Sequence, residues 1–127
     1  RKETDFLVLG SGIAGLTFAL KAAEKGKVMI MTKARADESN TKYAQGGIAG
    51  VMHAPDTFEK HIRDTLIAGA GLCREDVVRM VVTEGAERIR EIIEWGTRFD
   101  RNAQGDYDLA REGGHSEHRV LHFKDAT

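Results

Sequence analysis

Hydrophobic positions near the start of the chain predict a β-strand, a helix and a second β-strand. Residues 6–9 form a continuous apolar run, typical of a strand buried on both faces of a parallel sheet. A glycine-rich turn follows, and then apolar residues recur at helical spacing and define one face: Ile13, Leu16, Leu20 and Ala23. Gly26 supplies a helix stop, and residues 28–31 are again apolar. The pattern predicts an α/β fold built on a Rossmann-like βαβ unit.

Three glycines, Gly10, Gly12 and Gly15, lie between the first strand and the helix with the spacing Gly-x-Gly-x-x-Gly. The first allows a tight turn, the second lets the backbone approach a pyrophosphate, and the third lets the helix pack against the strand. The free N–H groups and the positive dipole end of the helix suit phosphate groups. The surrounding elements favour a dinucleotide site over a merely glycine-rich turn.

The end of the second strand bears on which dinucleotide is bound. NAD-type sites carry an acidic residue about 20 positions after the glycines, where it holds a ribose hydroxyl. This chain has Thr32 and Lys33 there. Thr32 can still bond a sugar hydroxyl and Lys33 can meet a phosphate, but the missing acid weakens an NAD assignment. The glycines alone do not separate FAD from NAD.

Residues 32–50 form a polar, glycine-rich loop that is too long for a simple connector. Tyr43, Ile48 and the adjacent Gly46 and Gly47 favour a backbone packed on a ligand over a mobile surface loop.

Two helices and a hairpin are expected after this loop. Asp56 can cap a helix whose apolar positions lie four apart: Phe58, Ile62, Leu66 and Ala70. A second helix starts around residues 74–76 and closes at Gly96, with Gly85 in its apolar stripe, which predicts a close helix crossing or a close backbone approach. Glu84 and Arg88 can pair on its solvent side. Residues 97–100 and 107–109 flank a turn-rich insert and predict a hairpin, and residues 119–123 predict another short strand.

Composition narrows the class of protein. The chain has 127 residues, 41% hydrophobic residues and a formal net charge of −1, so no electrostatic feature points to nucleic acid or to an anionic membrane as a partner. The single Cys73 suits a reducing compartment, and no signal peptide or membrane-spanning run is visible, so we expect a cytoplasmic protein. A doubly wound sheet needs more strands than this pattern provides, which predicts the N-terminal portion of a larger FAD-binding domain.

Five motifs carry a resemblance to a known family. They are Gly-Ser-Gly-Ile-Ala-Gly-Leu at 10–16, Tyr-Ala-Gln-Gly-Gly-Ile-Ala at 43–49, Asp-Thr-Leu-Ile-Ala-Gly-Ala-Gly at 64–71, Arg-Glu-Gly-Gly-His-Ser at 111–116 and Asp-Ala-Thr at 125–127. With them the chain resembles the N-terminal part of the L-aspartate oxidases, within the succinate dehydrogenase and fumarate reductase flavoprotein superfamily. Two alternatives stay open: a fumarate reductase or succinate dehydrogenase flavoprotein subunit, and a non-catalytic nucleotide-binding module.

The resemblance implies FAD-dependent oxidation of L-aspartate to iminoaspartate, with oxygen or fumarate as acceptor, as the first step of de novo NAD (quinolinate) biosynthesis. Quinolinate synthase is then a candidate partner. Succinate dehydrogenases carry a histidine, covalently bonded to FAD, at the position of Asn40, which implies non-covalent FAD here. They also carry a phenylalanine at the position of Glu112, a residue that the resemblance associates with orienting the substrate. A carboxylate facing the ammonium of aspartate gives a charge-assisted contact.

The resemblance also implies which residues bind the cofactor. Residues 11–14 hold the pyrophosphate, residues 32–33 reach the adenosine side, and residues 40–47 wrap the part near the flavin. The expected cofactor residues are Gly10, Ser11, Gly12, Ile13, Ala14, Gly15, Thr32, Lys33, Asn40, Thr41, Lys42, Tyr43, Ala44, Gln45, Gly46 and Gly47.

Some of the machinery is expected outside this sequence. The remaining FAD-domain strands, a capping domain, a C-terminal helical domain and the family's catalytic arginine are expected beyond Thr127, so we expect the chain alone to turn over no aspartate. Arg111 and Arg119 are not offered as substitutes for that arginine. The spacing of His115, His118 and His122 invites a metal site, but no metal is expected.

Overall fold

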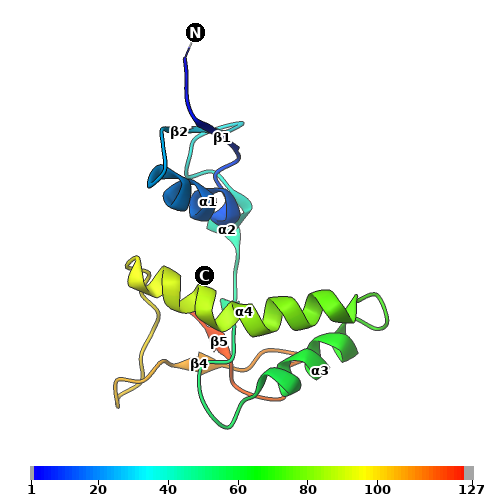
Figure 1. Ribbon diagram of the computed structural model, residues 1–127. Helices are drawn as coiled ribbons and strands as arrows, with labels where there is room; N and C mark the ends of the chain where they lie inside the picture. Colours follow the sequence, from blue (N-terminus) through cyan, green and yellow to red (C-terminus); the bar gives the residue numbers. More distant parts are fainter. Residues whose placement is uncertain (1, 125–127) are drawn as a thin grey trace. The chain divides into compact units, whose positions relative to one another are not determined.

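A computed structural model describes residues 2–124 of the chain (Figure 1). It divides into two compact units, Arg1–Ala44 and Gln45–Thr127, and each is described by itself. No helix within residues 2–124 has both the length and the apolar character needed to cross a membrane.

The first unit is a βαβ unit. Strand β1 (Phe6–Leu9) leads into helix α1 (Ile13–Ala23), and strand β2 (Val28–Met31) then pairs parallel with β1. The register runs from Phe6 opposite Val28 to Leu9 opposite Met31. The short helix α2 (Asn40–Tyr43) follows. The predicted bounds of both strands and the helix between them are confirmed.

The predicted burial of this unit is wrong on two points. Leu7 and Leu9 in β1 are exposed, because α1 covers one face of a sheet that has only two strands among the described residues. Ile13, Leu16 and Leu20 of α1 are exposed as well, and the buried side chains of the helix are Ala19 and Ala22. A Cβ atom on Gly15 would collide with the Gly10 carbonyl oxygen and meet the Val8 side chain at 3.4 Å. The helix therefore approaches so closely that only small side chains fit on its inner face.

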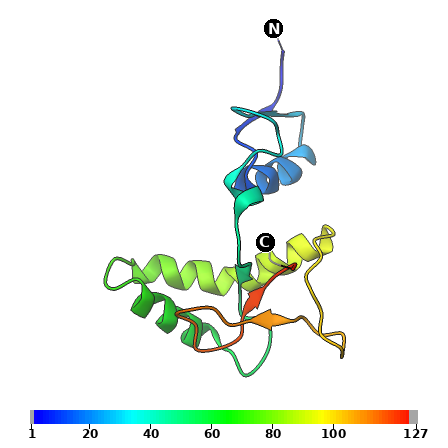
Figure 2. The ribbon, with the colours of Figure 1, turned by 180° about the vertical axis from the view of Figure 1, so that it is seen from behind.

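The second unit combines two helices with a three-stranded antiparallel sheet (Figure 2). The strands are β3 (Ile48–Ala49), β4 (Leu109–Ala110) and β5 (Val120–Leu121), in the order β3-β5-β4. Helices α3 (Phe58–Ala68) and α4 (Glu75–Glu94) pack against each other. A cluster of four buried apolar side chains lies in the core of this unit: Ile89, Phe99, Leu109 and Leu121.

Several local predictions for this unit need correction. Thr57, not Asp56, caps α3, because its hydroxyl accepts from the Lys60 amide while Asp56 is buried against Arg119. The loop at residues 32–50 contains α2 and β3, so it is not structureless. The predicted hairpin is reduced to a turn closed by the bridge between Arg101 and Tyr107, since β4 pairs with β5 instead. The strand predicted over residues 119–123 is shorter, and it is the central one.

Helix α4 keeps its predicted ends, but two of its details differ. Arg88 pairs with Glu87 and Glu91, at 2.7 and 3.1 Å, rather than with Glu84. A Cβ atom on Gly85 would meet nothing within 4 Å among the described residues, so the expected close crossing at this glycine is wrong.

Substituting Gly85 by alanine should therefore stabilise the chain. Alanine has the higher helix propensity, and we expect Gly85→Ala to raise the free energy of unfolding of the 127-residue chain by roughly 0.5–1 kcal/mol. Urea unfolding followed by circular dichroism measures the change. Gly47→Ala is the control in the same unit, and should lower this free energy by about 1–3 kcal/mol, because its Cβ would collide with the Leu121 carbonyl. A less stable Gly85→Ala variant would contradict the prediction.

Candidate functional site

The glycine turn of the first unit has the geometry that its spacing predicts. Gly10 adopts a positive φ of +103°, and Gly12 is the extended residue that precedes α1 and offers no side-chain cap. A Cβ atom on Gly12 would meet the Thr41 hydroxyl oxygen at 3.6 Å. The same oxygen accepts a hydrogen bond from the Ile13 amide at 3.1 Å. The structure thus brings Thr41 to the N-terminus of α1, where one of the amides expected to face a phosphate already has an acceptor.

The predicted residues after β2 are mostly exposed, whereas Ser11 in the glycine turn is buried. The Thr32 hydroxyl donates to the Ala34 carbonyl, and Lys33 is exposed. In α2, the Lys42 ammonium lies 3.1 Å from the Asp37 carboxylate. The Tyr43 hydroxyl donates to Glu38, and this contact raises the pKa of Tyr43. Asn40 and Ala44 are exposed at the two ends of this short helix.

In the second unit, the predicted Gly46 and Gly47 lie against two other segments. Both have positive φ, +97° and +135°. An ideal Cβ on Gly46 would stand 2.6 Å from a Glu112 carboxylate oxygen, and one on Gly47 would collide with the Leu121 carbonyl of β5. The structure thus brings the candidate substrate residue Glu112 onto a segment expected to wrap the cofactor. Gln45, next to these glycines, is exposed.

The first unit fits the pyrophosphate of a dinucleotide cofactor, because its glycine turn leaves the backbone bare before α1. A side chain at Gly15 would overlap the Gly10 carbonyl, and Gly12 places no side chain of its own at this N-terminus, where the Thr41 hydroxyl lies. A backbone without side chains at a helix N-terminus is what close approach of a pyrophosphate requires.

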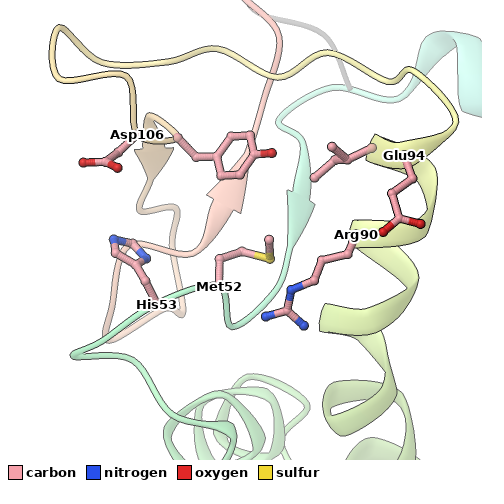
Figure 3. A pocket seen from close by; sticks show the side chains of 7 residues that line it. Met52, His53, Arg90, Glu94 and Asp106 are labelled. Atoms are coloured by element: carbon pink, nitrogen blue, oxygen red, sulfur yellow. The ribbon is translucent and has the colours of Figure 1, made fainter.

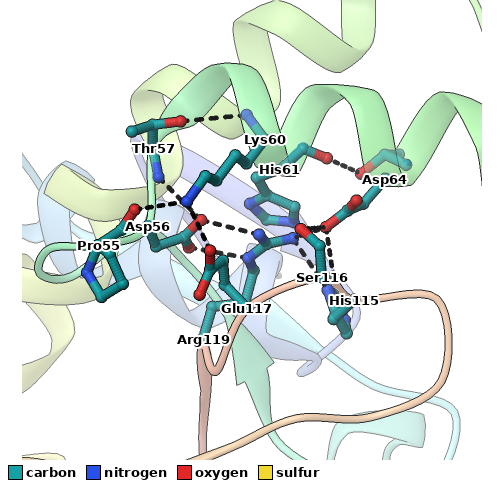
Figure 4. Close-up of polar contacts among 11 residues, drawn as sticks. Pro55, Asp56, Thr57, Lys60, His61, Asp64, His115, Ser116, Glu117 and Arg119 are labelled. Carbon is teal, nitrogen blue, oxygen red and sulfur yellow. Dashed lines mark hydrogen bonds and ion pairs between the residues drawn. The ribbon is translucent and has the colours of Figure 1, made fainter.

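The loop that carries Glu112 is anchored at its far end by Asp64 of α3 (Figure 4). Ser116 donates twice to one Asp64 carboxylate oxygen, Oδ2, through its amide at 2.8 Å and its hydroxyl at 2.7 Å. Within the loop, the His115 amide donates to the Glu112 carbonyl at 3.2 Å, and Gly114 has a φ of +87°.

Sequence analysis assigned no role to Arg119, but the structure shows that it is a buried charged residue with several partners. Its side chain is fully buried, and it binds Asp56 through two hydrogen bonds of 2.8 Å, from Nε and Nη2. Its Nη1 donates at 2.6 Å to the same Asp64 oxygen that Ser116 uses. Burial by itself would lower the pKa of Arg119, but the two carboxylates raise it. The only sequence signal is an arginine inside a strand, preceding the apolar Val120 and Leu121.

The electrostatics of Asp64 follow from these contacts. Partial burial by itself would raise the pKa of Asp64, but the Ser116 amide and hydroxyl and the Arg119 guanidinium outweigh it and lower that pKa from 3.8 to about 2. Asp64 is therefore ionised throughout the physiological range.

Two histidines lie beside Arg119. The His115 Nδ1 atom lies 3.3 Å from Arg119 Nη1, and because arginine only donates, this is a hydrogen bond when Nδ1 carries no proton. The ring of His61 lies 5.8 Å from that of His115. Burial lowers the pKa of His61, as do Arg119 and His115. Its buried Nδ1 atom has no hydrogen-bond partner among the described residues.

The three histidines considered for a metal site have separate partners. His118 Nδ1 lies 2.9 Å from the Leu109 carbonyl, and His122 lies near Asp100 and Asp108. His115 faces Arg119.

A pocket of about 480 Å³ lies elsewhere in the second unit (Figure 3). It is lined from the segment after β3, from α4 and from the turn before β4, by Met52, His53, Arg90, Ile93, Glu94, Asp106 and Tyr107. None of these residues was predicted as a site residue. The pocket mixes charges of both signs with apolar side chains.

Comparison with known proteins places the chain within a described domain family. The family model for the FAD binding domain matches residues 5–127. Among curated proteins, the chain is 54% identical to L-aspartate oxidase 2-a of Nicotiana tabacum, a chloroplastic protein, over 97% of this chain and 19% of that protein. It is 47% identical to L-aspartate oxidase of Vibrio cholerae, over 98% and 24%. The chain therefore spans about a fifth of the length of these relatives.

The chain is also similar in structure to parts of two solved proteins. The chain is similar to the Mycobacterium smegmatis Sdh1 complex with UQ1, with a TM-score of 0.91 and 30% identity over 100% of this chain and 22% of that chain. It is similar to a quinol-fumarate reductase with menaquinol molecules, with a TM-score of 0.89 and 32% identity over 98% and 22%. The Asp-Ala-Thr motif at residues 125–127, which carried part of the resemblance, lies outside the described residues.

Asp64→Asn should cost stability in a pH-dependent way. Because folding depresses the pKa of Asp64, its charge stabilises the fold fully above the ordinary value of 3.8, and this contribution is lost as the pH falls toward about 2. We expect the variant to unfold with a free energy lower by about 1.5–3 kcal/mol at pH 7. The difference from wild type should shrink below about pH 4.

Urea unfolding of the 127-residue chain between pH 7 and pH 2.5 tests this dependence. Asp37→Asn is the matched control, since Asp37 is an exposed carboxylate paired with Arg35 and Lys42 and should change stability little. A constant gap between wild type and Asp64→Asn at all pH values would contradict the assigned electrostatics.

Proposed function

The chain belongs to the FAD binding domain family, and we propose that the complete protein is an FAD-dependent oxidoreductase that oxidises L-aspartate to iminoaspartate. The observation that carries this proposal is the position of Glu112. Its carboxylate lies against Gly46, in a segment expected to wrap the cofactor. The names of the curated relatives, which are L-aspartate oxidases, support the same activity.

The cofactor is FAD, which supplies a two-electron acceptor when bound. Amides of residues 11–14 hold its pyrophosphate at the N-terminus of α1; the Ile13 amide, which donates to the Thr41 hydroxyl in this structure, would have to exchange or share that acceptor. Thr32 and Lys33 bind the adenosine side, and residues 40–47 surround the flavin. Asn40 cannot form the covalent histidine link of succinate dehydrogenases, so the cofactor is held non-covalently.

Glu112 recognises the substrate ammonium. Aspartate differs from succinate by one ammonium group, and an unpaired ammonium in a closed site is costly. A carboxylate facing it forms a charge-assisted contact, which orients the carbon that bears nitrogen. The catalytic arginine and the other dicarboxylate-binding residues belong to parts of the protein outside this sequence.

An electron acceptor completes the catalytic cycle, and another enzyme uses the product. Oxygen or fumarate accepts the electrons, and iminoaspartate passes to quinolinate synthase in the formation of NAD. We place the protein in the cytoplasm, because its single cysteine suits a reducing compartment.

A second candidate function is a fumarate reductase or succinate dehydrogenase flavoprotein subunit. The likeness to solved structures of that class favours it. Asn40 and Glu112 argue against this function. By the resemblance, they occupy the positions where succinate dehydrogenases carry the flavin-linked histidine and a phenylalanine.

Substrate oxidation by the full-length protein distinguishes the candidates. We expect a yellow protein that releases its flavin on acid denaturation and that oxidises aspartate but not succinate, followed as flavin bleaching under anaerobic conditions. Oxidation of succinate would favour the second candidate. Flavin binding without oxidation of either substrate would indicate a non-catalytic nucleotide-binding module.

Glu112→Gln tests the assigned recognition residue. Loss of the charge opposite the substrate ammonium should lower kcat/KM for aspartate by about 10- to 100-fold, while fumarate reduction changes little, because fumarate has no ammonium. Steady-state kinetics of both half-reactions measure the ratio. Arg111→Gln, at the neighbouring exposed position, is the control and should not reproduce this selective loss. Equal losses in the two half-reactions of Glu112→Gln would contradict its role.

A further inference from the structure

We propose that Asp64, Ser116 and Arg119 form a positioning chain that fixes the Glu112 carboxylate for recognition of the substrate ammonium. This inference rests on the proposed function, and it assigns the selectivity for aspartate to residues that touch neither substrate nor cofactor. We refer to the three residues as the anchor.

The anchor is needed because the loop between Glu112 and Ser116 has few side-chain contacts that would fix its conformation. Between Glu112 and His115 lie Gly113 and Gly114, which have no side chains to pack, and a Cβ on Gly113 would meet nothing within 4 Å. Glycine pairs lose much conformational entropy on ordering. The position of Glu112 against Gly46 therefore depends on how firmly the end of the loop is held.

That end is held by Ser116. Its amide and hydroxyl both donate to Asp64 Oδ2, at 2.8 and 2.7 Å. Hydrogen bonds to an ionised carboxylate are stronger than those between neutral groups. Two such bonds on Ser116 fix both its backbone and its side chain, so this end of the loop is held against α3 in one orientation.

Arg119 fixes the Asp64 carboxylate in turn. It donates to Asp64 Oδ2 at 2.6 Å, and its other two donor atoms grip Asp56 at 2.8 Å each. The guanidinium is fully buried, on the residue immediately before the central strand β5, so it cannot swing away into solvent. The Asp64 carboxylate of α3 is thereby held against the start of this strand.

A second contact ties the loop to the same arginine. His115 accepts from Arg119 Nη1 at 3.3 Å when its Nδ1 is unprotonated, and its own amide donates to the Glu112 carbonyl at 3.2 Å. The contacts from Arg119 through His115 thus reach the Glu112 backbone, which sets where its side chain starts.

The test uses Ser116→Ala in the full-length protein, which removes one hydrogen bond of the anchor and leaves the Ser116 amide in place. We expect KM for aspartate to rise about three- to tenfold, with kcat/KM for fumarate reduction changed less than twofold. Ser116→Thr, which retains a hydroxyl, should restore the KM. Thr83→Ala is the matched control, because it removes a hydroxyl that bonds a helix carbonyl in α4.

A double-mutant cycle separates positioning from a general structural role. If Ser116 acts through Glu112, then Ser116→Ala should add no further loss of aspartate use in the Glu112→Gln background. Flavin content and melting temperature of Ser116→Ala should match those of the wild type.

Each outcome has a distinct meaning. Additive losses in the cycle, or equal effects on aspartate oxidation and fumarate reduction, overturn the inference while leaving the proposed function intact. An unchanged KM in Ser116→Ala overturns it as well. A wild-type protein that oxidises no aspartate overturns the proposed function, and the inference falls with it.

Discussion

The buried ion pairs of Arg119 are the interaction on which the second unit depends. A guanidinium without solvent contact is costly unless its donors are satisfied, and here Asp56 and Asp64 satisfy them. The arginine immediately precedes β5, Asp64 lies on α3 and Asp56 just before α3. One side chain therefore ties the central strand to the start of α3 and to the loop that carries Glu112. Removing either carboxylate leaves a buried charge short of a partner, which disturbs the helix and the loop together.

Local pattern predicted most of the first unit but not its packing. The bounds of β1, α1 and β2 follow from apolar runs and glycines, which act over a few residues. Their burial depends on how many layers surround them, and helical spacing does not say which side of α1 faces a strand. The close approach at Gly15 selects Ala19 and Ala22 over the larger Leu16 and Leu20.

Long-range ion pairs explain the predictions that failed in the second unit. Asp56 and Thr57 both have the chemistry of a helix cap, and nothing local shows that an arginine 63 positions away along the chain binds the aspartate. Likewise, Asp64 and Ser116 belong to two motifs of the resemblance, but their spacing in sequence does not reveal that they bind each other. The individual site residues were predictable, whereas the contacts that orient them needed the fold.

Substrate choice in such a domain cannot come from the backbone that it shares with its structural relatives. A fold that supports several reactions leaves the discrimination to a few side chains. Gly46 and Gly47 show how little room those side chains have, since one lies against Glu112 and the other against the Leu121 carbonyl. Because the Glu112 carboxylate lies against Gly46, exchanging it for an aromatic ring would change both the charge and the shape beside this glycine segment.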